Sequence, residues 1–265
     1  MYLFLFLIVC YNILRGGTMI RNKVVLVTGS SKGIGAACIK KLASQNYDVV
    51  INYNKSEKEA KELYRYIKDN YKVNCLLIKC DLTKEDEIKN MVNEIIDKLG
   101  KIDILVNNAA ISIDTLYEDK TKDNFMKTLE VNLVGTFLVS KYVCDNMYHN
   151  KYGKVVNITS TNGIDKYYPM CLDYDASKAG LISLTHNLAL EYAPYINVNA
   201  IAPGWVKTES EMKDLDLDYI KSEEEKIFLK RFAEPEEIAS LVSFLVSDEA
   251  SYINNEIIRI DGGTY

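Results

Sequence analysis

The sequence is poor in the residues that build metal centres, disulfide frameworks and nucleic-acid surfaces. It has two histidines and six cysteines, and no two cysteines stand in Cys-x-x-Cys spacing, so no metal site is expected. The scattered cysteines favour buried thiols in a reducing compartment, and hence a cytoplasmic protein. With a net charge of −5 and no block of Lys and Arg interleaved with aromatic residues, general affinity for nucleic acid is not expected.

Internal repeats, low-complexity tracts and linkers rich in proline or glycine are also lacking. The chain has 265 residues, of which 48% are hydrophobic, and that is enough to bury one substantial core. We therefore expect one domain over residues 21–265, preceded by an apolar extension over residues 1–20.

The extension begins with the most apolar run in the chain, MYLFLFLIVCYNIL. This run is shorter than the about 20 residues that span a bilayer, and it lacks the charged start and the cleavage site of a signal peptide. Three interpretations stay open: a peripheral membrane or partner-binding segment, an extra packed element, and an artefact of start-site choice. We favour the last, because the codons for Arg15-Gly16-Gly17 shortly before Met19 resemble a bacterial ribosome-binding site. Membrane association is not expected. The intact mass of the native protein would test the start-site hypothesis, since a chain that begins at Met1 would contradict it.

From residue 23 onward, short apolar runs alternate with longer amphipathic stretches. Runs rich in Val and Ile, without polar alternation, suit strands that are covered on both faces, while residues 85–99 carry one apolar stripe at helical spacing. This alternation predicts a single-domain, Rossmann-like, doubly wound parallel α/β sheet of about seven strands, with helices on both faces. The expected strands are 23–27, 48–52, 75–78, 102–106, 154–158, 196–201 and 256–260.

A glycine cluster follows the first expected strand, and an amphipathic helix from about residue 34 to 45 comes next. Glycines let the backbone turn sharply and approach a pyrophosphate, and a helix N-terminus offers the phosphates free N–H groups and a positive dipole end. A glycine-rich turn without a ligand is the alternative, but the strand before it and the helix after it favour a dinucleotide site. The contacts predicted in this loop are Gly29, Ser31, Lys32, Gly33, Ile34 and Gly35.

No carboxylate closes the second expected strand, where NAD-specific sites place an Asp or Glu for the ribose hydroxyls. The residues there include Asn54 and Lys55, so a 2′-phosphate would meet no negative charge. Lys32 in the glycine loop is suited to pair with that phosphate; the alternative is that Lys32 and Lys55 are solvated surface lysines. We expect NADP(H) to be preferred, with NAD(H) as the alternative and with Asn54 among the cofactor contacts.

Tyr174 and Lys178 form the most informative chemical pattern. On a helix they share one face, and the lysine ammonium then stabilises the phenolate and lowers the pKa of the tyrosine from about 10, which suits acid-base work. Ser160 ends an expected strand, where ligands bind in open parallel sheets, and its hydroxyl could hold a carbonyl oxygen. In isolation a Tyr-x-x-x-Lys pattern indicates only a surface pair, but the serine and the glycine loop favour a catalytic site.

Together these motifs resemble the short-chain dehydrogenase/reductase family, over about residues 23–263. Asp81 and Leu82 resemble the family's adenine-contacting pair. The run from Asn107 to Ala110 resembles its Asn-Asn-Ala-Gly segment, with Ala110 where glycine is usual, which should narrow the space beside the cofactor. The cofactor contacts that the resemblance implies outside the glycine loop are Asp81, Leu82, Asn108, Ala109, Ala110, Tyr174, Lys178, Pro203, Val206 and Thr208.

The resemblance also implies four catalytic residues, Asn132, Ser160, Tyr174 and Lys178. In the family, the residue at Asn132 holds a water of the proton relay, and the lysine both binds the nicotinamide ribose and lowers the pKa of the tyrosine. The segment between Ser160 and Tyr174 is one residue longer than in many relatives, which affects the fine placement of the substrate loop.

Within the family, the chain is similar to bacterial 3-oxoacyl-(acyl-carrier-protein) reductases. This similarity implies NADPH-dependent reduction of an acyl-carrier-linked 3-oxoacyl thioester in fatty acid biosynthesis, and a homotetramer with helices near 125–150 and 175–193 at its interfaces. The alternatives are a sugar dehydrogenase of the glucose 1-dehydrogenase type, a steroid alcohol dehydrogenase, and a non-catalytic NAD(P)-binding regulator. Residues 209–230, expected to form a mobile lid, are where such enzymes differ most.

Overall fold

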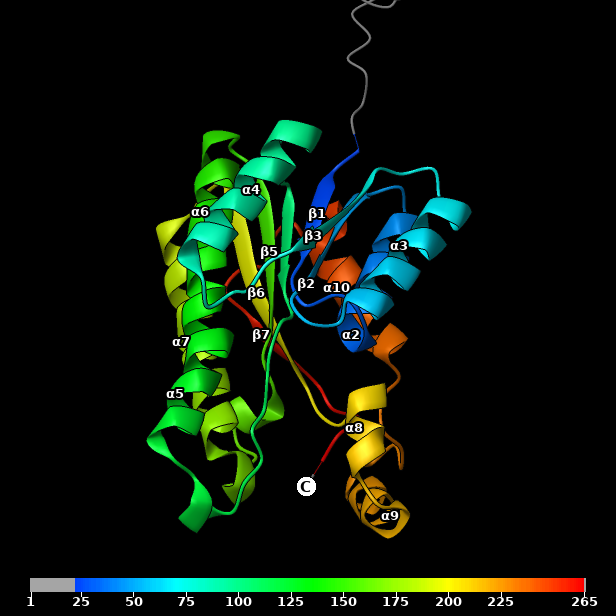
Figure 1. The fold of residues 1–265 in the computed structure, drawn as a ribbon, viewed down its shortest axis with the longest axis vertical. Helices are drawn as coiled ribbons and strands as arrows, with labels where there is room; N and C mark the ends of the chain where they lie inside the picture. Colours follow the sequence, from blue (N-terminus) through cyan, green and yellow to red (C-terminus); the bar gives the residue numbers. More distant parts are fainter. Residues whose placement is uncertain (1–21, 265) are drawn as a thin grey trace, which may run out of the picture.

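A seven-stranded, wholly parallel sheet organises the computed structural model (Figure 1). The structure describes residues 22–264, apart from the side chains of Ser210, Glu211 and Asp214, so the predicted extension over residues 1–20 lies outside it. The strand order is β3-β2-β1-β4-β5-β6-β7, which confirms the predicted fold class. The strands are β1 (Val24–Val27), β2 (Asp48–Tyr53), β3 (Cys75–Lys79), β4 (Ile104–Asn107), β5 (Gly153–Ile158), β6 (Ile196–Pro203) and β7 (Ile257–Ile260).

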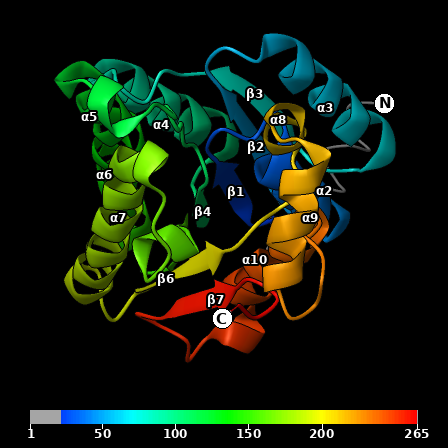
Figure 2. The ribbon, with the colours of Figure 1, turned by 90° about the horizontal axis from the view of Figure 1, so that it is seen from below.

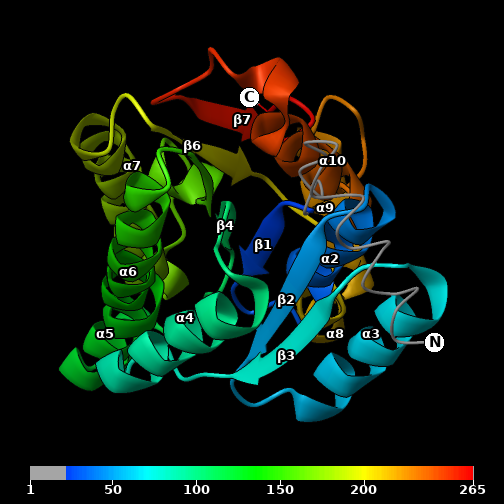
Figure 3. The ribbon, with the colours of Figure 1, turned by 90° about the horizontal axis from the view of Figure 1, so that it is seen from above.

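Helices cover both faces of this sheet (Figure 3). One core joins the sheet to α2 (Gly33–Ser44), α3 (Glu57–Asn70) and α10 (Pro235–Val246). The other joins it to α4 (Glu85–Leu99), α6 (Thr136–His149) and α7 (Leu172–Glu191). Every residue of β1, β2, β4 and β5 is buried, because each of these strands is covered on both sides, and this is why their sequences show no polar alternation.

The strand order reverses between β1 and β4, since β1 pairs with β2 on one side and β4 on the other. In open parallel sheets, ligands bind outside the carboxyl ends of the strands at this switch point. The loops that follow β1, β4, β5 and β6 all leave from this edge of the sheet, which faces the viewer in Figure 2. The short helices α8 (Glu209–Asp214) and α9 (Leu217–Lys226) lie beyond the same edge.

The expected helix near residues 125–150 is interrupted. It consists of α5 (Lys122–Leu129), a π-helical segment (Glu130–Gly135) and α6. At its end Gly135 packs against another loop so closely that a Cβ there would lie 2.7 Å from the Leu82 carbonyl oxygen. Such a π-helical bulge is often found at functional sites, and hydrophobic periodicity gives no sign of it.

The bounds of the fourth strand, the lid segment and the cysteines were also predicted from the sequence. The fourth strand begins at Ile104 rather than at residue 102, and the expected lid contains α8 and α9. The cysteines between residues 22 and 264 are buried and free, as predicted. Within that range, no helix is long and apolar enough to cross a membrane. Short 3₁₀ turns occur at Tyr117–Asp119, Thr161–Gly163, Pro169–Cys171 and Asp248–Ala250.

Candidate active site

The glycine turn after β1 has the backbone that only glycine adopts easily. Gly29 and Gly33 have φ angles of 59° and 57°, and a Cβ at Gly35 would lie 2.6 Å from Asn108 Nδ2 and 2.7 Å from Ser30 Cα. Positive φ favours glycine at the first two positions and lack of space favours it at the third. Lys32, the N-cap residue of α2, makes no side-chain hydrogen bond to the first turn, and N–H groups at a helix N-terminus suit a phosphate.

The segment after β4 holds this turn in place. Asn108 donates from Nδ2 to the carbonyl oxygens of Thr28 and Gly29, both at 3.0 Å. The Thr28 hydroxyl accepts the backbone N–H groups of Asn108 and Ala109 at 3.0 and 3.1 Å. These two predicted contacts therefore shape the turn, while Ala110 is exposed beside it.

The residues predicted at the adenosine end come from the ends of β2 and β3. Burial opposes ionisation of Asp81, but hydrogen bonds from Thr83 and Asn54 outweigh it and hold the pKa of Asp81 below its usual value. Asn54 and Asp81 are thus neighbours, as the predicted site requires. Lys32 and Asn54 are exposed, while Leu82 is buried.

Tyr174 and Lys178 lie on one face of α7, as the spacing predicted. The Lys178 Nζ atom is 5.3 Å from the centroid of the Tyr174 ring. Lys178 is 2% exposed and donates from Nζ to the Ile158 carbonyl oxygen at 2.8 Å. Burial lowers the pKa of Lys178 to about 8. The structure therefore places a buried ammonium group beside a half-buried phenol.

Ser160 follows the end of β5, beside the face of α7 that carries Tyr174 and Lys178. The 3₁₀ turn that follows it packs directly on α7, since a Cβ at Gly163 would lie 2.7 Å from the Lys178 carbonyl carbon. The Ser160 hydroxyl accepts the Asn162 backbone N–H at 3.2 Å and donates to Asn162 Oδ1 at 3.4 Å. The second bond is long, so a better-placed acceptor can replace it. The turn that follows Ser160 therefore lies against the helix that carries Tyr174 and Lys178, although Ser160 and Tyr174 are 14 positions apart in the sequence.

Asn132 lies inside the π-helical segment and is 1% exposed. Its Oδ1 accepts the Ile111 N–H at 2.8 Å, and its Nδ2 donates to the Ile111 carbonyl oxygen at 2.8 Å and to Ser177 Oγ at 3.0 Å. Thr136 Oγ1 donates to the Asn132 carbonyl oxygen at 2.9 Å. The asparagine side chain thus ties the loop after β4 to α7, next to Lys178.

The loop after β6 closes the arrangement from the opposite side. Pro203 ends β6, and Val206 is buried and bridges to Ala233. A Cβ at Gly33 would lie 3.3 Å from Thr208 Cγ2, so Thr208 lies against the glycine turn. The predicted site residues on the loops after β1 to β6 therefore lie along the carboxyl edge of the sheet, and Asn132 and Lys178 lie within the helical segments beside it.

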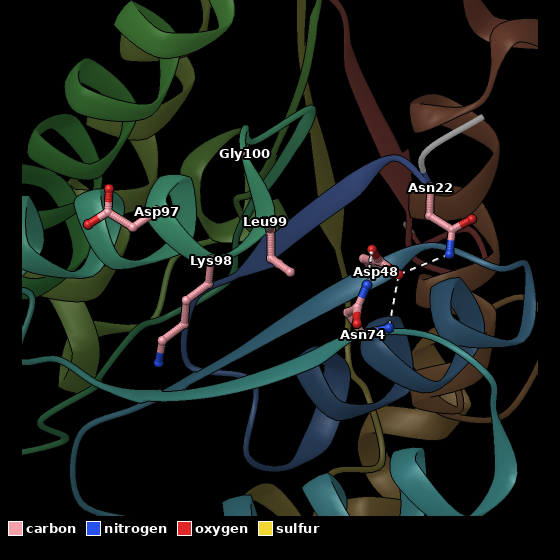
Figure 4. Close-up of a pocket in the computed structure, with 7 residues that line it drawn as sticks. All are labelled: Asn22, Asp48, Asn74, Asp97, Lys98, Leu99 and Gly100. Carbon is pink, nitrogen blue, oxygen red and sulfur yellow. Dashed lines mark hydrogen bonds between the residues drawn. The ribbon is translucent and has the colours of Figure 1, made fainter. Parts of the chain in front are cut away.

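A polar cavity lies at the opposite, amino edge of the sheet (Figure 4). There the Asp48 carboxylate accepts Asn22 Nδ2 at 2.9 Å, and the backbone N–H and Nδ2 of Asn74 at 2.9 and 2.8 Å. These bonds satisfy the carboxylate and join two loops to the start of β2, so they indicate a structural role. No cluster of three potential metal ligands occurs among the described residues.

Sequence reasoning missed an aromatic cluster beside the site. The single tryptophan, Trp205, stacks on Phe232 with ring centroids 5.3 Å apart. Tyr168 and Tyr219 approach Trp205 edge-on, each at 6.2 Å. The cluster joins the loop after β5 to α9. Its only sequence signal is a tryptophan four positions beyond the end of the expected strand 196–201.

Comparison with known proteins identifies the family. A family model described as enoyl-(acyl carrier protein) reductase matches residues 29–265. The chain belongs to the short-chain dehydrogenase/reductase family. It is therefore an NAD(P)-dependent oxidoreductase, as the motifs predicted.

Three relatives illustrate the range of this family around the chain. The 3-oxoacyl-[acyl-carrier-protein] reductase of Aquifex aeolicus is 39% identical over 253 residues, which cover 93% of this chain and 98% of the relative. Glucose 1-dehydrogenase 2 of Bacillus subtilis is 34% identical, with 91% and 94% covered. The crystal structure of an actinorhodin polyketide ketoreductase with NADPH has a TM-score of 0.85 at 27% identity, with 91% and 97% covered.

Burial of Lys178 predicts a pH dependence of stability in this dehydrogenase. Its pKa falls from 10.5 to about 8 on folding, so between these pH values the unfolded chain binds a proton that the folded chain lacks. The unfolding free energy of the cofactor-free wild type should therefore rise with pH relative to Lys178→Met, by roughly 3 kcal/mol in all. Denaturant titrations from pH 7 to pH 11 measure this difference, and a constant difference would contradict the prediction.

Proposed function

We propose that this enzyme reduces the 3-oxo group of an acyl thioester with NADPH and yields the 3-hydroxyacyl form. The observation that carries the proposal is the convergence of Ser160, Tyr174 and buried Lys178 at the carboxyl edge of the sheet, beside a glycine turn shaped for a pyrophosphate. Geometry of this kind supports proton transfer to a carbonyl oxygen.

The residues present fit a dinucleotide. The N–H groups of the first turn of α2, which the N-cap residue Lys32 does not cap, and the positive φ angles of Gly29 and Gly33 would provide donors and close backbone approach for the phosphates. Asn54 and Asp81 would hold the adenosine part, and Lys178 the nicotinamide ribose. The remaining contacts would come from the segments that end at Ala110 and Thr208. A bound nicotinamide supplies the hydride in such a site.

The chain's own residues would handle the oxygen. The Ser160 hydroxyl accepts the Asn162 N–H; it would turn from Asn162 Oδ1, 3.4 Å away, to donate to the carbonyl oxygen and orient it. Tyr174 gives its phenolic proton to that oxygen as negative charge develops on it. The Lys178 ammonium, 5.3 Å from the ring centroid, stabilises the resulting phenolate. Asn132 fixes the backbone beside Lys178, and a water held there would return a proton to the Tyr174 phenolate by way of the Lys178 ammonium.

NADPH is favoured over NADH by the end of β2. Asn54 and Lys55 are exposed there, and Lys32 is exposed on the glycine turn. No carboxylate ends β2, so a 2′-phosphate meets amide and ammonium groups instead of a negative charge.

An acyl substrate is favoured over a sugar by the surfaces of the two loops that follow β4 and β5. Besides exposed polar residues such as Asp114 and Glu118, these loops carry exposed apolar side chains, and apolar surface of this kind suits the binding of an apolar ligand. The apolar side chains are Leu116, Tyr117, Ile164, Tyr167 and Met170.

The physiological state that we propose is a cytoplasmic homotetramer acting on an acyl-carrier-linked substrate. In support of it, α6 and α7 carry exposed apolar residues on the surface of the single chain, among them Phe137, Tyr148 and Leu190. Leu190 is 82% exposed, which suits burial between subunits better than contact with water.

A substrate panel tests the proposed function. NADPH and NADH oxidation would be followed with an acetoacetyl thioester, and NADP and NAD reduction with glucose and with a steroid alcohol. We expect NADPH with the thioester to give a kcat/KM at least about tenfold above every other pair, since binding differences of this size separate related substrates. Faster turnover of glucose or the steroid would overturn the substrate class, and no turnover of any pair would favour a regulator.

A further inference from the structure

Helix α7 carries an acidic residue on each side of Tyr174. Successive helical residues project about 100° apart, so Asp173 and Asp175 point to opposite sides of the phenol. Each carboxylate is engaged by a different loop of the site. Neither residue belongs to the motifs from which the activity was inferred.

Asp173 faces α5 and the loop after β4. Its side chain is 0% exposed and that of Lys120 is 5% exposed. Lys120 Nζ lies 2.8 Å from Asp173 Oδ1, and Thr128 Oγ1 donates to Oδ2 at 2.6 Å. Burial opposes ionisation of Asp173, but these hydrogen bonds outweigh it and hold its pKa below the usual value. Lys120 also donates to the Ile113 carbonyl oxygen, so the ion pair fixes the whole loop after β4 to the helix.

Asp175 faces the loop after β5 and is linked to Ser160 by hydrogen bonds through Asn162. Its Oδ1 accepts Asn162 Nδ2 at 2.7 Å, and its Oδ2 accepts the Tyr168 backbone N–H at 2.9 Å. The backbone N–H of the same Asn162 donates to Ser160 Oγ at 3.2 Å. The serine hydroxyl is therefore held in place by a chain of bonds that ends on the residue next to Tyr174.

The two loops are also joined to each other, since the Thr115 N–H donates to the Met170 carbonyl oxygen at 3.1 Å. We propose that Asp173 and Asp175 are positioning residues. Asp173 sets the loop after β4, and Asp175 sets Ser160, at a fixed distance from Tyr174, so that a carbonyl between the loops meets both hydroxyls. This inference rests on the proposed function, because it assumes that Tyr174 and Ser160 act on the substrate oxygen.

Epistasis with Ser160 tests the role of Asp175. We expect Asp175→Ala to lower kcat/KM for acetoacetyl-coenzyme A by about 30-fold, because small misplacements of reacting groups cost one to two orders of magnitude. The dissociation constant of NADPH should stay within twofold. In a Ser160→Ala background the same change should cost less than about threefold, since the hydroxyl that Asp175 positions is gone.

Asp123→Ala is the matched control, because Asp123 is an exposed aspartate in the first turn of α5. It should leave kcat/KM unchanged within twofold. An Asp175→Ala effect of the same size in both backgrounds would indicate a merely structural role and overturn the inference, as would no effect in either.

A pair of variants tests Asp173. Lys120→Met should lower the melting temperature, because it leaves a buried carboxylate without its cation. Lys120→Met/Asp173→Asn removes that charge and should restore the melting temperature, yet KM for acetoacetyl-coenzyme A should stay about tenfold raised, because the link to the loop is still missing. A KM that returns to the wild-type value together with the melting temperature would overturn the inference. If the single variant does not fold, the double variant alone decides.

These outcomes are separable from failure of the proposed function. If Tyr174→Phe retains full activity, the acid-base assignment is wrong whatever the aspartate variants do. If Tyr174→Phe and Ser160→Ala abolish turnover while Asp175→Ala has no effect, only the positioning role is wrong.

Discussion

Tyr174→Phe should lower kcat for NADPH-dependent reduction of a 3-oxoacyl thioester by about 10³-fold, within the range for loss of a general acid. The substitution removes one oxygen from a half-buried ring and leaves the packing of α7 intact. Lys178 should keep its bond to the Ile158 carbonyl oxygen, which is 2.8 Å long in the wild type, and so should still bind the cofactor ribose. We therefore expect the dissociation constant of NADPH to change less than twofold.

Tyr252→Phe is the control for this experiment. Tyr252 precedes β7, lies outside the loops of the proposed site and is fully exposed, so loss of its hydroxyl should leave kcat within twofold of the wild type. Steady-state kinetics and NADPH fluorescence titration of both variants supply the measurements. A Tyr174→Phe enzyme with more than about a tenth of wild-type kcat would show that another group protonates the oxygen.

Gly35→Ala should weaken NADPH binding by at least about 100-fold. The new methyl group would lie 2.6 Å from Asn108 Nδ2, 2.7 Å from Ser30 Cα and 3.0 Å from the Gly29 carbonyl oxygen. Two of these atoms belong to backbone and the third is fixed by bonds to Thr28 and Gly29, so the turn itself must shift. A turn displaced by even a fraction of an ångström no longer brings its N–H groups to the phosphates.

Gly180→Ala offers a matched substitution on α7. A Cβ there would meet Leu133 Cδ2 at 2.8 Å, the far end of a flexible side chain that can rotate away. We expect its NADPH affinity to stay within threefold of the wild type. Isothermal titration with NADPH, together with melting temperatures to show that both variants fold, measures the contrast. Equal affinities for Gly35→Ala and Gly180→Ala would contradict the role assigned to the glycine turn.

Much of the fold could be predicted from the sequence, because strands and helices here follow local patterns. The Val- and Ile-rich runs became buried parallel strands, and the apolar stripe of residues 85–99 became α4 with the expected bounds. The glycine spacing was likewise a local signal, since positive φ and close approach leave few alternatives to glycine. The observed strand ends differ from the expected ones by one or two residues, as at Ile104, because the boundary of a strand depends on where its partner strand pairs with it.

The π-helical segment around Asn132 and the buried Lys120–Asp173 ion pair left no comparable signal. Lys120 and Asp173 are 53 positions apart in the sequence. Each, taken alone, is a residue type that is common at exposed positions near helix ends. Only the packing of α5 and the loop after β4 against α7 removes both from water, and only then does their charge have a specific partner.

The sequence by itself determined the order of strands and helices, the glycine turn and the helical face shared by Tyr174 and Lys178, since each follows from the period of the backbone over a few residues. The tertiary structure alone decided which loops meet at that face, how deeply Lys178 is buried and which carboxylate is linked to Ser160 through Asn162. Those features depend on contacts between segments distant in the chain, and desolvation and hydrogen bonding at such contacts have no counterpart in a local pattern.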